Sequence, residues 1–144
     1  MPDAPLLPVV ADATKGGVTT VDVVAAVVDE GGKYLVTRRQ AGVHLAGMWE
    51  FPGGKVGEAE THAQALRREM AEELGVDVAV DGLVLSTSHS YPDRTVALHF
   101  YKCRLLGPPM PQLGQQMQWV RRSELRTLEF PPADADLIAL LSDS

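Results

Sequence analysis

The stretch GGKVGEAETHAQALRREMAEELGV, residues 53–76, joins a glycine pair to a segment with the marks of a helix. Thr61 followed three residues later by Gln64 fits a capping box, in which each side chain bonds the other residue's backbone N–H. The apolar residues that follow recur at spacings of three and four: Ala63, Leu66, Met70 and Leu74. Gly75 is the expected C-terminal stop. The stretch therefore predicts a helix over residues 61–74 with one buried stripe.

Three glutamates of this helix, Glu69, Glu72 and Glu73, fall within about one turn and share a face. Like charges at such spacings destabilise an isolated helix by roughly 0.2–0.5 kcal/mol for each pair. One interpretation is a solvated acidic face that Arg67 and Arg68 partner. The other is a site for a hard divalent cation such as Mg²⁺, which prefers carboxylate and carbonyl oxygens. The strand and glycine turn before the helix favour the cation site, because they place an exposed backbone carbonyl beside the carboxylates.

The segments on either side of this stretch alternate between strand-like runs and turns. Strands are expected, in chain order, at residues 21–28, 33–39, 49–51, 76–88, 94–106 and 118–120. Pro52-Gly53-Gly54 reads as a turn in which glycine supplies unusual backbone angles. Prolines open a final helix within 130–142. We expect an α/β domain of residues 21–144, with helices packed against a mixed sheet, after a flexible N-terminal tail of residues 1–20.

The composition limits the classes of function. The chain has 144 residues, enough for one domain with a sizeable core, and a net charge of −6. That charge argues against an extended nucleic-acid contact, although a small anionic ligand can bind where a cation or several arginines converge. Cys103 is the single cysteine, which excludes an internal disulfide and favours a small buried side chain. No signal peptide or membrane-spanning run is visible, so a cytoplasmic location is expected.

The same stretch carries the pattern that defines the Nudix hydrolase family, and on this ground the chain resembles that family. The pattern is glycine, five residues, glutamate, seven residues, Arg-Glu, an aliphatic residue, any residue, Glu-Glu, any residue, glycine and an aliphatic residue. Every spacing is satisfied by Gly54, Glu60, Arg68, Glu69, Met70, Glu72, Glu73, Gly75 and Val76. The resemblance implies the Nudix fold, a mixed β-sheet sandwiched between α-helices. It also implies hydrolysis of a nucleoside diphosphate linked to a further group.

The resemblance implies roles for individual residues. The family's metal ligands correspond to one backbone carbonyl and three carboxylates: Gly53, Glu69, Glu72 and Glu73. The implied metal is Mg²⁺, for which Mn²⁺ could substitute. Arg68 joins the three glutamates in the catalytic set and is expected to hold a metal-binding carboxylate by a charge-assisted hydrogen bond, with Glu60 as its partner. Glu69 is the expected base.

The segment TRRQAGVHLAGMWEFPGGK, residues 37–55, resembles the MutT-type branch, which hydrolyses nucleoside triphosphates to the monophosphate and pyrophosphate. In that branch the second arginine of the pair, here Arg39, contacts the nucleotide. Three further residues are expected to bind substrate: Glu50, Phe51 and Lys55. The implied role is nucleotide-pool sanitisation, the removal of oxidised or surplus nucleotides such as 8-oxo-dGTP, which supports DNA repair.

The late segment FPPADAD, residues 130–136, is similar to bacterial 8-oxo-dGTP hydrolases but has Asp134 where they carry asparagine. An ionised aspartate only accepts hydrogen bonds. Asp134 could therefore bind the N1–H and amine of a guanine or the 4-amino group of a cytosine, and could donate to a guanine carbonyl only if protonated. The base preference stays open between 8-oxoguanine and cytosine-type nucleotides. In the alternative interpretation, Asp134 caps the last helix.

A second departure lies in the loop QLGQQMQWV, residues 112–120, where MutT-type enzymes usually place a glutamate near the metals. This chain has Gln118 there, a poor base, so the base is expected on the helix instead. The alternatives are a CTP/dCTP-type pyrophosphohydrolase, another nucleoside-diphosphate-X hydrolase, or a non-catalytic nucleotide-sensing Nudix domain. The expected partner is a small nucleotide, with no stable nucleic-acid complex and no membrane. Whether the chain is a monomer or a homodimer stays open, as do the sugar preference, the phosphorus attacked and the number of metals.

Overall fold

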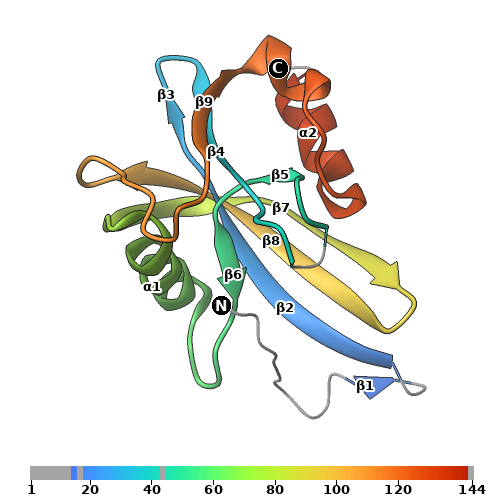
Figure 1. The fold of residues 1–144 in the computed structure, drawn as a ribbon. Helices are drawn as coiled ribbons and strands as arrows, with labels where there is room; N and C mark the ends of the chain where they lie inside the picture. Colours follow the sequence, from blue (N-terminus) through green and yellow to red (C-terminus); the bar gives the residue numbers. More distant parts are fainter. Residues whose placement is uncertain (1–13, 16–17, 43–44, 143–144) are drawn as a thin grey trace.

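The computed structural model describes residues 14–15, 18–42 and 45–142, which form two β-sheets between two α-helices (Figure 1). The larger sheet has the order β1 (Thr14–Lys15), β2 (Val18–Val27), β8 (Arg94–Leu105) and β7 (Val78–Tyr91), with β6 (Gly53–Lys55) also on β2. In the smaller sheet, β4 (Lys33–Arg38) pairs with β3 (Asp29–Glu30), β5 (Trp49–Glu50) and β9 (Met117–Arg121). The β2–β8 pair is parallel and every other described pair is antiparallel. The predicted α/β class with a mixed sheet is therefore confirmed.

The acidic helix α1 (His62–Leu74) begins and ends as the sequence predicts. Thr61 Oγ1 accepts a hydrogen bond from the Gln64 N–H at 3.1 Å, and Gln64 Oε1 accepts one from the Thr61 N–H at 2.8 Å. Gly75 ends the helix with a left-handed φ of 60°. The predicted stripe is wrong at its first residue, because Ala63 is exposed and Ala65 is buried in its place. The buried face of α1 thus begins two residues later than predicted.

The remaining helical segments follow β9. They are the 3₁₀ turns η2 (Arg122–Thr127) and η3 (Pro132–Asp134) and the helix α2 (Ala135–Ser142). The predicted final helix is thus confirmed, and prolines precede it. No helix among the described residues is both long and apolar enough to cross a membrane.

Strand β2 separates two hydrophobic cores, which explains why its sequence is apolar without alternation. One core joins β2 to α1 and includes Val24, Ala26, Leu66, Met70 and Leu74. The other joins β2 to α2 and includes Ala25, Val27, Phe100, Leu137 and Leu141. The helices lie on opposite sides of the larger sheet (Figure 1). Cys103 is buried in the first core, as expected, and burial raises the pKa of its thiol to about 12.

Strand pairing starts within the segment that the sequence assigns to a flexible tail. Thr14–Lys15 pairs with the first residues of β2, Val18 and Thr19. Residues 1–13 and 16–17 lie outside the described part of the chain, so the tail itself stays a prediction.

Candidate active site

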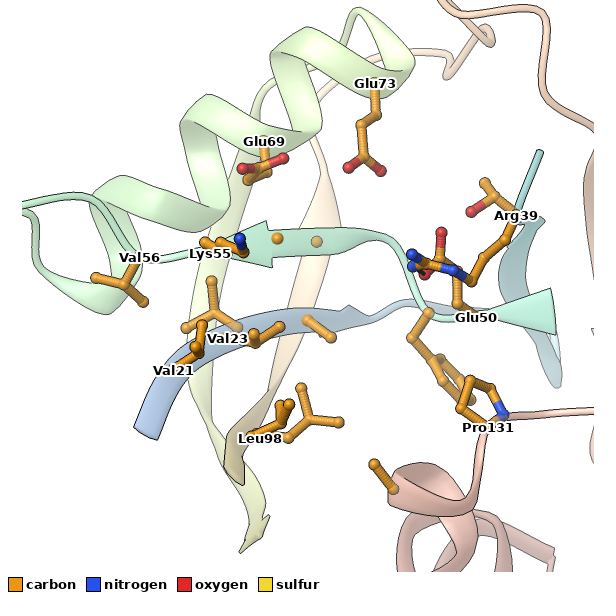
Figure 2. A pocket seen from close by; sticks show the side chains of 18 of the residues that line it. Val21, Val23, Arg39, Glu50, Lys55, Val56, Glu69, Glu73, Leu98 and Pro131 are labelled. Atoms are coloured by element: carbon orange, nitrogen blue, oxygen red, sulfur yellow. Dashed lines mark hydrogen bonds and ion pairs between the residues drawn. The ribbon is translucent and has the colours of Figure 1, made fainter. Parts of the chain in front are cut away.

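A cavity of about 870 Å³ opens between the larger sheet, α1 and the segment that leads into α2. Its floor is made of apolar residues at alternate positions of β2 and β8: Val21, Val23, Val96 and Leu98. Figure 2 shows Glu69 and Glu73 projecting from α1 on one side of this space, with Arg39 and Glu50 on another. The acidic face of the helix and an apolar surface therefore meet in one cavity.

The glycine pair at the start of the motif lets three elements come close together. The predicted unusual backbone angles are absent, because neither Gly53 nor Gly54 has a positive φ and both lie in β6, paired with β2. A Cβ on Gly53 would collide with the Val24 carbonyl oxygen, and one on Gly54 would collide with the Glu69 carboxylate. These glycines are needed for close approach, which brings β6 against both the sheet and the acidic side chains.

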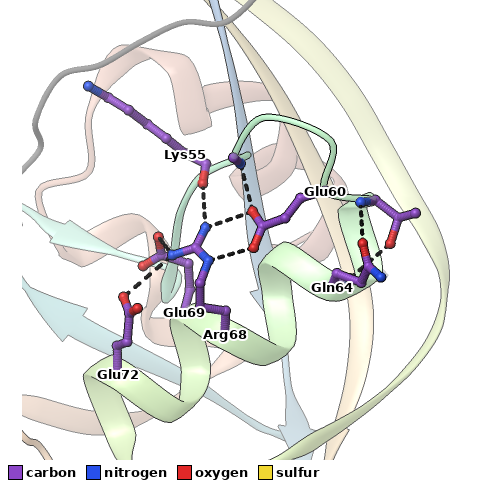
Figure 3. Close-up of polar contacts among 8 residues, drawn as sticks. Lys55, Glu60, Gln64, Arg68, Glu69 and Glu72 are labelled. Atoms are coloured by element: carbon purple, nitrogen blue, oxygen red, sulfur yellow. Dashed lines mark hydrogen bonds and ion pairs between the residues drawn. The ribbon is translucent and has the colours of Figure 1, made fainter.

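Arg68 ties the loop before α1 to the helix (Figure 3). Its Nε and Nη2 donate to the Glu60 carboxylate at 2.6 and 2.9 Å, and Nη2 also donates to the Lys55 carbonyl at 2.9 Å. Nη1 donates to Glu69 at 2.9 Å and to Glu72 at 3.4 Å. The hydrogen bond from Arg68 lowers the pKa of Glu60. The structure thus contains the contact that the sequence predicts between Arg68 and a carboxylate of the acidic face.

Glu69 and Glu73 lie side by side, the first buried and the second half-buried. Glu69 is only 5% exposed, and the carboxyl groups of the pair share a hydrogen bond. Burial raises the pKa of Glu69, although the Arg68 hydrogen bond opposes this. Burial also raises the pKa of Glu73 well above its usual range, and the charges of Glu50 and Glu69 add to the effect. Such a pair is costly to ionise without a compensating positive charge.

The third predicted carboxylate is placed differently. The Glu72 side chain is 57% exposed and lies on the Arg68 side of the helix. In the described part of the chain, no three His, Cys, Asp or Glu side chains are arranged to hold a metal ion. Gly53 contacts Glu73 through its N–H, which donates to the carboxyl group. The ligand set of Gly53, Glu69, Glu72 and Glu73 therefore stays a prediction.

The chemistry of these donors nevertheless fits a hard divalent cation. The Glu69–Glu73 pair offers oxygen ligands of the kind that Mg²⁺ prefers. A bound cation would also offset the repulsion and desolvation that raise both pKa values.

The residues expected to bind substrate all line the same cavity: Arg39, Glu50, Phe51, Lys55 and Asp134. Arg39 Nη1 and Glu50 Oε1 form an ion pair at 2.8 Å, with both side chains partly exposed. Phe51 is 3% exposed and stacks on Phe130 with 5.5 Å between ring centroids, so it belongs to the core as well as to the cavity wall.

Asp134 is a buried carboxyl group at the edge of this cavity. It is 5% exposed, and no described hydrogen bond involves its side chain. Its backbone N–H donates to the Pro131 carbonyl at 2.9 Å. Because no described hydrogen bond joins the Asp134 side chain to the first residues of α2, the alternative of a side-chain helix cap is not observed. Burial raises the pKa of Asp134 to about 7; the Glu50 charge contributes, and the Arg39 charge acts against it.

The loop before β9 contributes a different glutamine from the expected one. Gln118 is exposed and absent from the cavity lining, because β9 already begins at Met117 and Gln118 pairs with Val36 in the sheet. Gln115 lines the cavity instead, and its Nε2 donates to the Glu73 carbonyl at 2.9 Å. Gln115 could be identified from the sequence only if the start of β9 were known to within one residue. Sequence patterns do not locate strand ends that accurately.

Two further cavity residues, Tyr91 and Arg94, come from the β7–β8 hairpin. A signal for Arg94 exists in the sequence. Side chains alternate along a strand, so Arg94 shares a face with Val96 and Leu98, which form the floor. The predicted strand begins at this residue, as β8 does, but Arg94 also ends the turn sequence YPDR and carries no other mark of a functional residue.

Fold and site together define a class of protein, an α/β domain with a strand–loop–helix segment that contains Gly54, Glu60, Arg68 and Glu69. This segment presents a pair of carboxyl groups to a cavity large enough for a nucleotide. Residues 23–140 match the NUDIX domain family. The chain therefore belongs to the Nudix family.

Two curated relatives and one solved structure illustrate the branch. The chain is 37% identical to an 8-oxo-dGTP diphosphatase of Escherichia coli K12 over 114 residues, which cover 78% of this chain and 88% of the relative. It is 36% identical to a CTP pyrophosphohydrolase of the same organism over 118 residues, with 81% and 86% covered. The solution structure of the E. coli ORF135 protein superposes with a TM-score of 0.75 at 35% identity, covering 89% of this chain and 90% of that one. The predicted MutT-type branch is confirmed, and these homologues indicate a hydrolase acting on phosphoanhydride bonds.

Proposed function

We propose that the chain hydrolyses (deoxy)nucleoside triphosphates to the monophosphate and pyrophosphate with the help of Mg²⁺, and that oxidised nucleotides such as 8-oxo-dGTP are its preferred substrates. One observation carries the proposal. A single cavity has a carboxyl pair on α1 with one buried and one half-buried member, an apolar floor, and a buried carboxyl group, Asp134, without a described hydrogen bond. The carboxyl pair suits the triphosphate, and the apolar floor suits the sugar and base. Asp134 suits the polar edge of the base.

At the phosphate end, Glu69, Glu72 and Glu73 with the Gly53 carbonyl would hold the metal. When bound, Mg²⁺ neutralises phosphate oxygens and lowers the pKa of a coordinated water. Glu69 is the proposed base that takes the proton of the attacking water, because Arg68 fixes its carboxylate at 2.9 Å. Lys55 and Arg39, which both line the cavity, supply positive charge for the phosphates and the nucleotide.

At the base end, the protonation of Asp134 bears on which base is bound. With a pKa of about 7, the carboxyl group is partly protonated near neutral pH. The protonated form can accept from the N7–H of 8-oxoguanine and donate to its O6, as an asparagine side chain could. The ionised form only accepts, which suits the 4-amino group of cytosine. A CTP/dCTP-type activity is therefore the second candidate, and the similarity to a CTP pyrophosphohydrolase supports it.

The test is incubation of the full chain with Mg²⁺ and a panel of nucleotides, including 8-oxo-dGTP, dGTP, dCTP and CTP, with separation of the products. We expect pyrophosphate and monophosphate, with the highest kcat/KM for 8-oxo-dGTP. On the acidic side of neutrality the preference for 8-oxo-dGTP over dCTP should be largest. Absence of pyrophosphate release from every triphosphate would refute the proposal, whereas a pH-independent preference for dCTP would favour the second candidate.

A further inference from the structure

The loop between β8 and β9 provides hydrogen-bond donors for the C-terminal end of α1. The last four carbonyl groups of a helix have no partner within the helix itself. At this end of α1, the Leu74 carbonyl accepts from the Met110 N–H at 2.8 Å. The Glu73 carbonyl accepts two hydrogen bonds at 2.9 Å, from the Gln112 N–H and from Gln115 Nε2. The loop therefore caps the acidic helix beside Glu73 (Figure 1).

Gln115 uses both ends of its side-chain amide to join the loop to the helix. Nε2 donates to the Glu73 carbonyl, and Oε1 accepts from the Leu113 N–H at 2.9 Å. Gly114, with a left-handed φ of 75°, makes the turn that lets the Gln115 side chain reach back to Leu113. The side chain is half-buried at the cavity wall. One amide group thus links a carbonyl of α1 to the backbone of the loop.

The same loop is attached to the segment after β4 that carries Arg39. Gln40 Nε2 donates to the Leu113 carbonyl at 2.7 Å, although 73 positions separate the two residues in the chain. Leu113 is therefore bonded on both sides, by Gln115 at its N–H and by Gln40 at its carbonyl. Since Gln40 directly follows Arg39, these hydrogen bonds connect the backbone of Glu73 to the segment that holds Arg39.

A second hydrogen bond joins the same two segments without reaching the helix. Gln116 Oε1 accepts from Arg38 Nη1 at 3.1 Å. Gln116 is exposed and outside the cavity lining, and its side chain makes no described hydrogen bond to α1. It therefore offers a matched control for Gln115, because it is the same residue type at the next position but does not bond the helix.

We infer that Gln115 is a positioning residue, which couples Glu73 in the proposed metal site to the segment of Arg39, the proposed nucleotide contact. In this role it touches neither metal nor substrate. It acts through the backbone of Glu73, whose carboxyl group needs a fixed position beside Glu69 to bind a cation. Loss of the amide releases the last turn of α1 and the loop together. The inference rests on the proposed function for the roles of Glu73 and Arg39.

The experiment compares wild type with Q115M, Q40M, the double variant Q40M/Q115M and the control Q116M. Methionine keeps the length of the glutamine side chain but cannot make these amide hydrogen bonds. Calorimetry measures the binding of Mn²⁺ alone, without nucleotide, and steady-state kinetics and melting curves in chelator complete the comparison. We expect Q115M to weaken Mn²⁺ binding about tenfold, to lower kcat and to raise KM, whereas Q116M should match wild type.

The variant Q40M tests the connection through Leu113. Alone, it should weaken Mn²⁺ binding about threefold, because it releases the loop at its other attachment. In the Q115M background it should have almost no further effect, because the path from Gln40 to Glu73 is already broken.

Other outcomes overturn the inference. A Q115M protein that melts earlier, but binds Mn²⁺ and turns over substrate like wild type, would make Gln115 only a helix cap. Independent effects of Q40M and Q115M on Mn²⁺ affinity would exclude a path through Leu113. If Q115M does not fold, Q115A gives the same comparison, and Q40M alone must still weaken Mn²⁺ binding. Because Mn²⁺ binding needs no turnover, a wild-type protein that binds Mn²⁺ without hydrolysing any triphosphate refutes the proposed function and leaves the test of Gln115 intact.

Discussion

Asp134 loses its contact with water on folding and gains no described hydrogen bond, so its carboxyl group titrates differently in the folded and unfolded chains. Its pKa rises from an ordinary 3.8 to about 7. The folded protein therefore binds the proton more tightly. The associated stability is fully present below the unfolded pKa and is lost as the pH rises through 7.

The substitution D134N should remove this dependence. As the pH rises from about 5 to about 8, the unfolding free energy of D134N is expected to increase relative to that of wild type by up to about 3 kcal/mol. Urea unfolding at several pH values measures the difference. D136N, which removes an exposed charge two residues away, controls for the change in net charge. If the difference in unfolding free energy between D134N and wild type stayed constant across this pH range, burial would not raise the pKa of Asp134.

At the scale of elements, α1 and the loop before it form one unit because Arg68 bonds both. R68K keeps the charge but cannot make the paired bonds to Glu60 together with those to Lys55 and Glu69. We expect R68K to lose about 1–3 kcal/mol of stability. Turnover should fall at least tenfold, because the Glu69 carboxylate loses its fixed donor.

R67K is the matched control for this prediction. Arg67 also makes a paired bond to a carboxylate, Asp77, but on the exposed side of the helix. Water and salt screen such exposed pairs, so R67K should have almost no effect in either denaturation or steady-state kinetics. If R67K and R68K had equal effects, the link between loop and helix would not depend on Arg68.

The elements also differ in how far the sequence alone predicts them. The ends of α1 are encoded locally by Thr61, Gln64 and Gly75, and the prediction of both ends is confirmed. Contacts between distant segments are not encoded locally. The closeness of Gly54 to Glu69 depends on how β6 packs on the helix, and the position of Gln115 depends on where β9 starts. For Arg94, alternation along the predicted strand, which starts at the same residue as β8, is sufficient.

At the scale of the whole molecule, the core between β2 and α1 holds the helix against the sheet firmly enough to keep Glu69 and Glu73 together despite their repulsion. Removing one charge from this pair should stabilise the protein in a chelator. We expect E73Q to melt above wild type under that condition, at roughly 2–4 °C for each kcal/mol gained. Mg²⁺ should reverse the order, because a ligand at a hundred times its Kd stabilises the folded state by about 2.7 kcal/mol.

The same variant links stability to the reaction. E73Q should gain little from Mg²⁺ and should lose turnover by orders of magnitude, since the proposed metal site loses a carboxylate. E129Q, which removes an exposed charge outside the cavity lining, controls for net charge and should follow wild type in both measurements. Melting curves in chelator and in Mg²⁺, with initial rates on the preferred triphosphate, provide the comparison. An E73Q protein that is less stable than wild type in chelator, yet stabilised equally by Mg²⁺, would place Glu73 outside the metal site and give its half-buried carboxyl group a purely structural role.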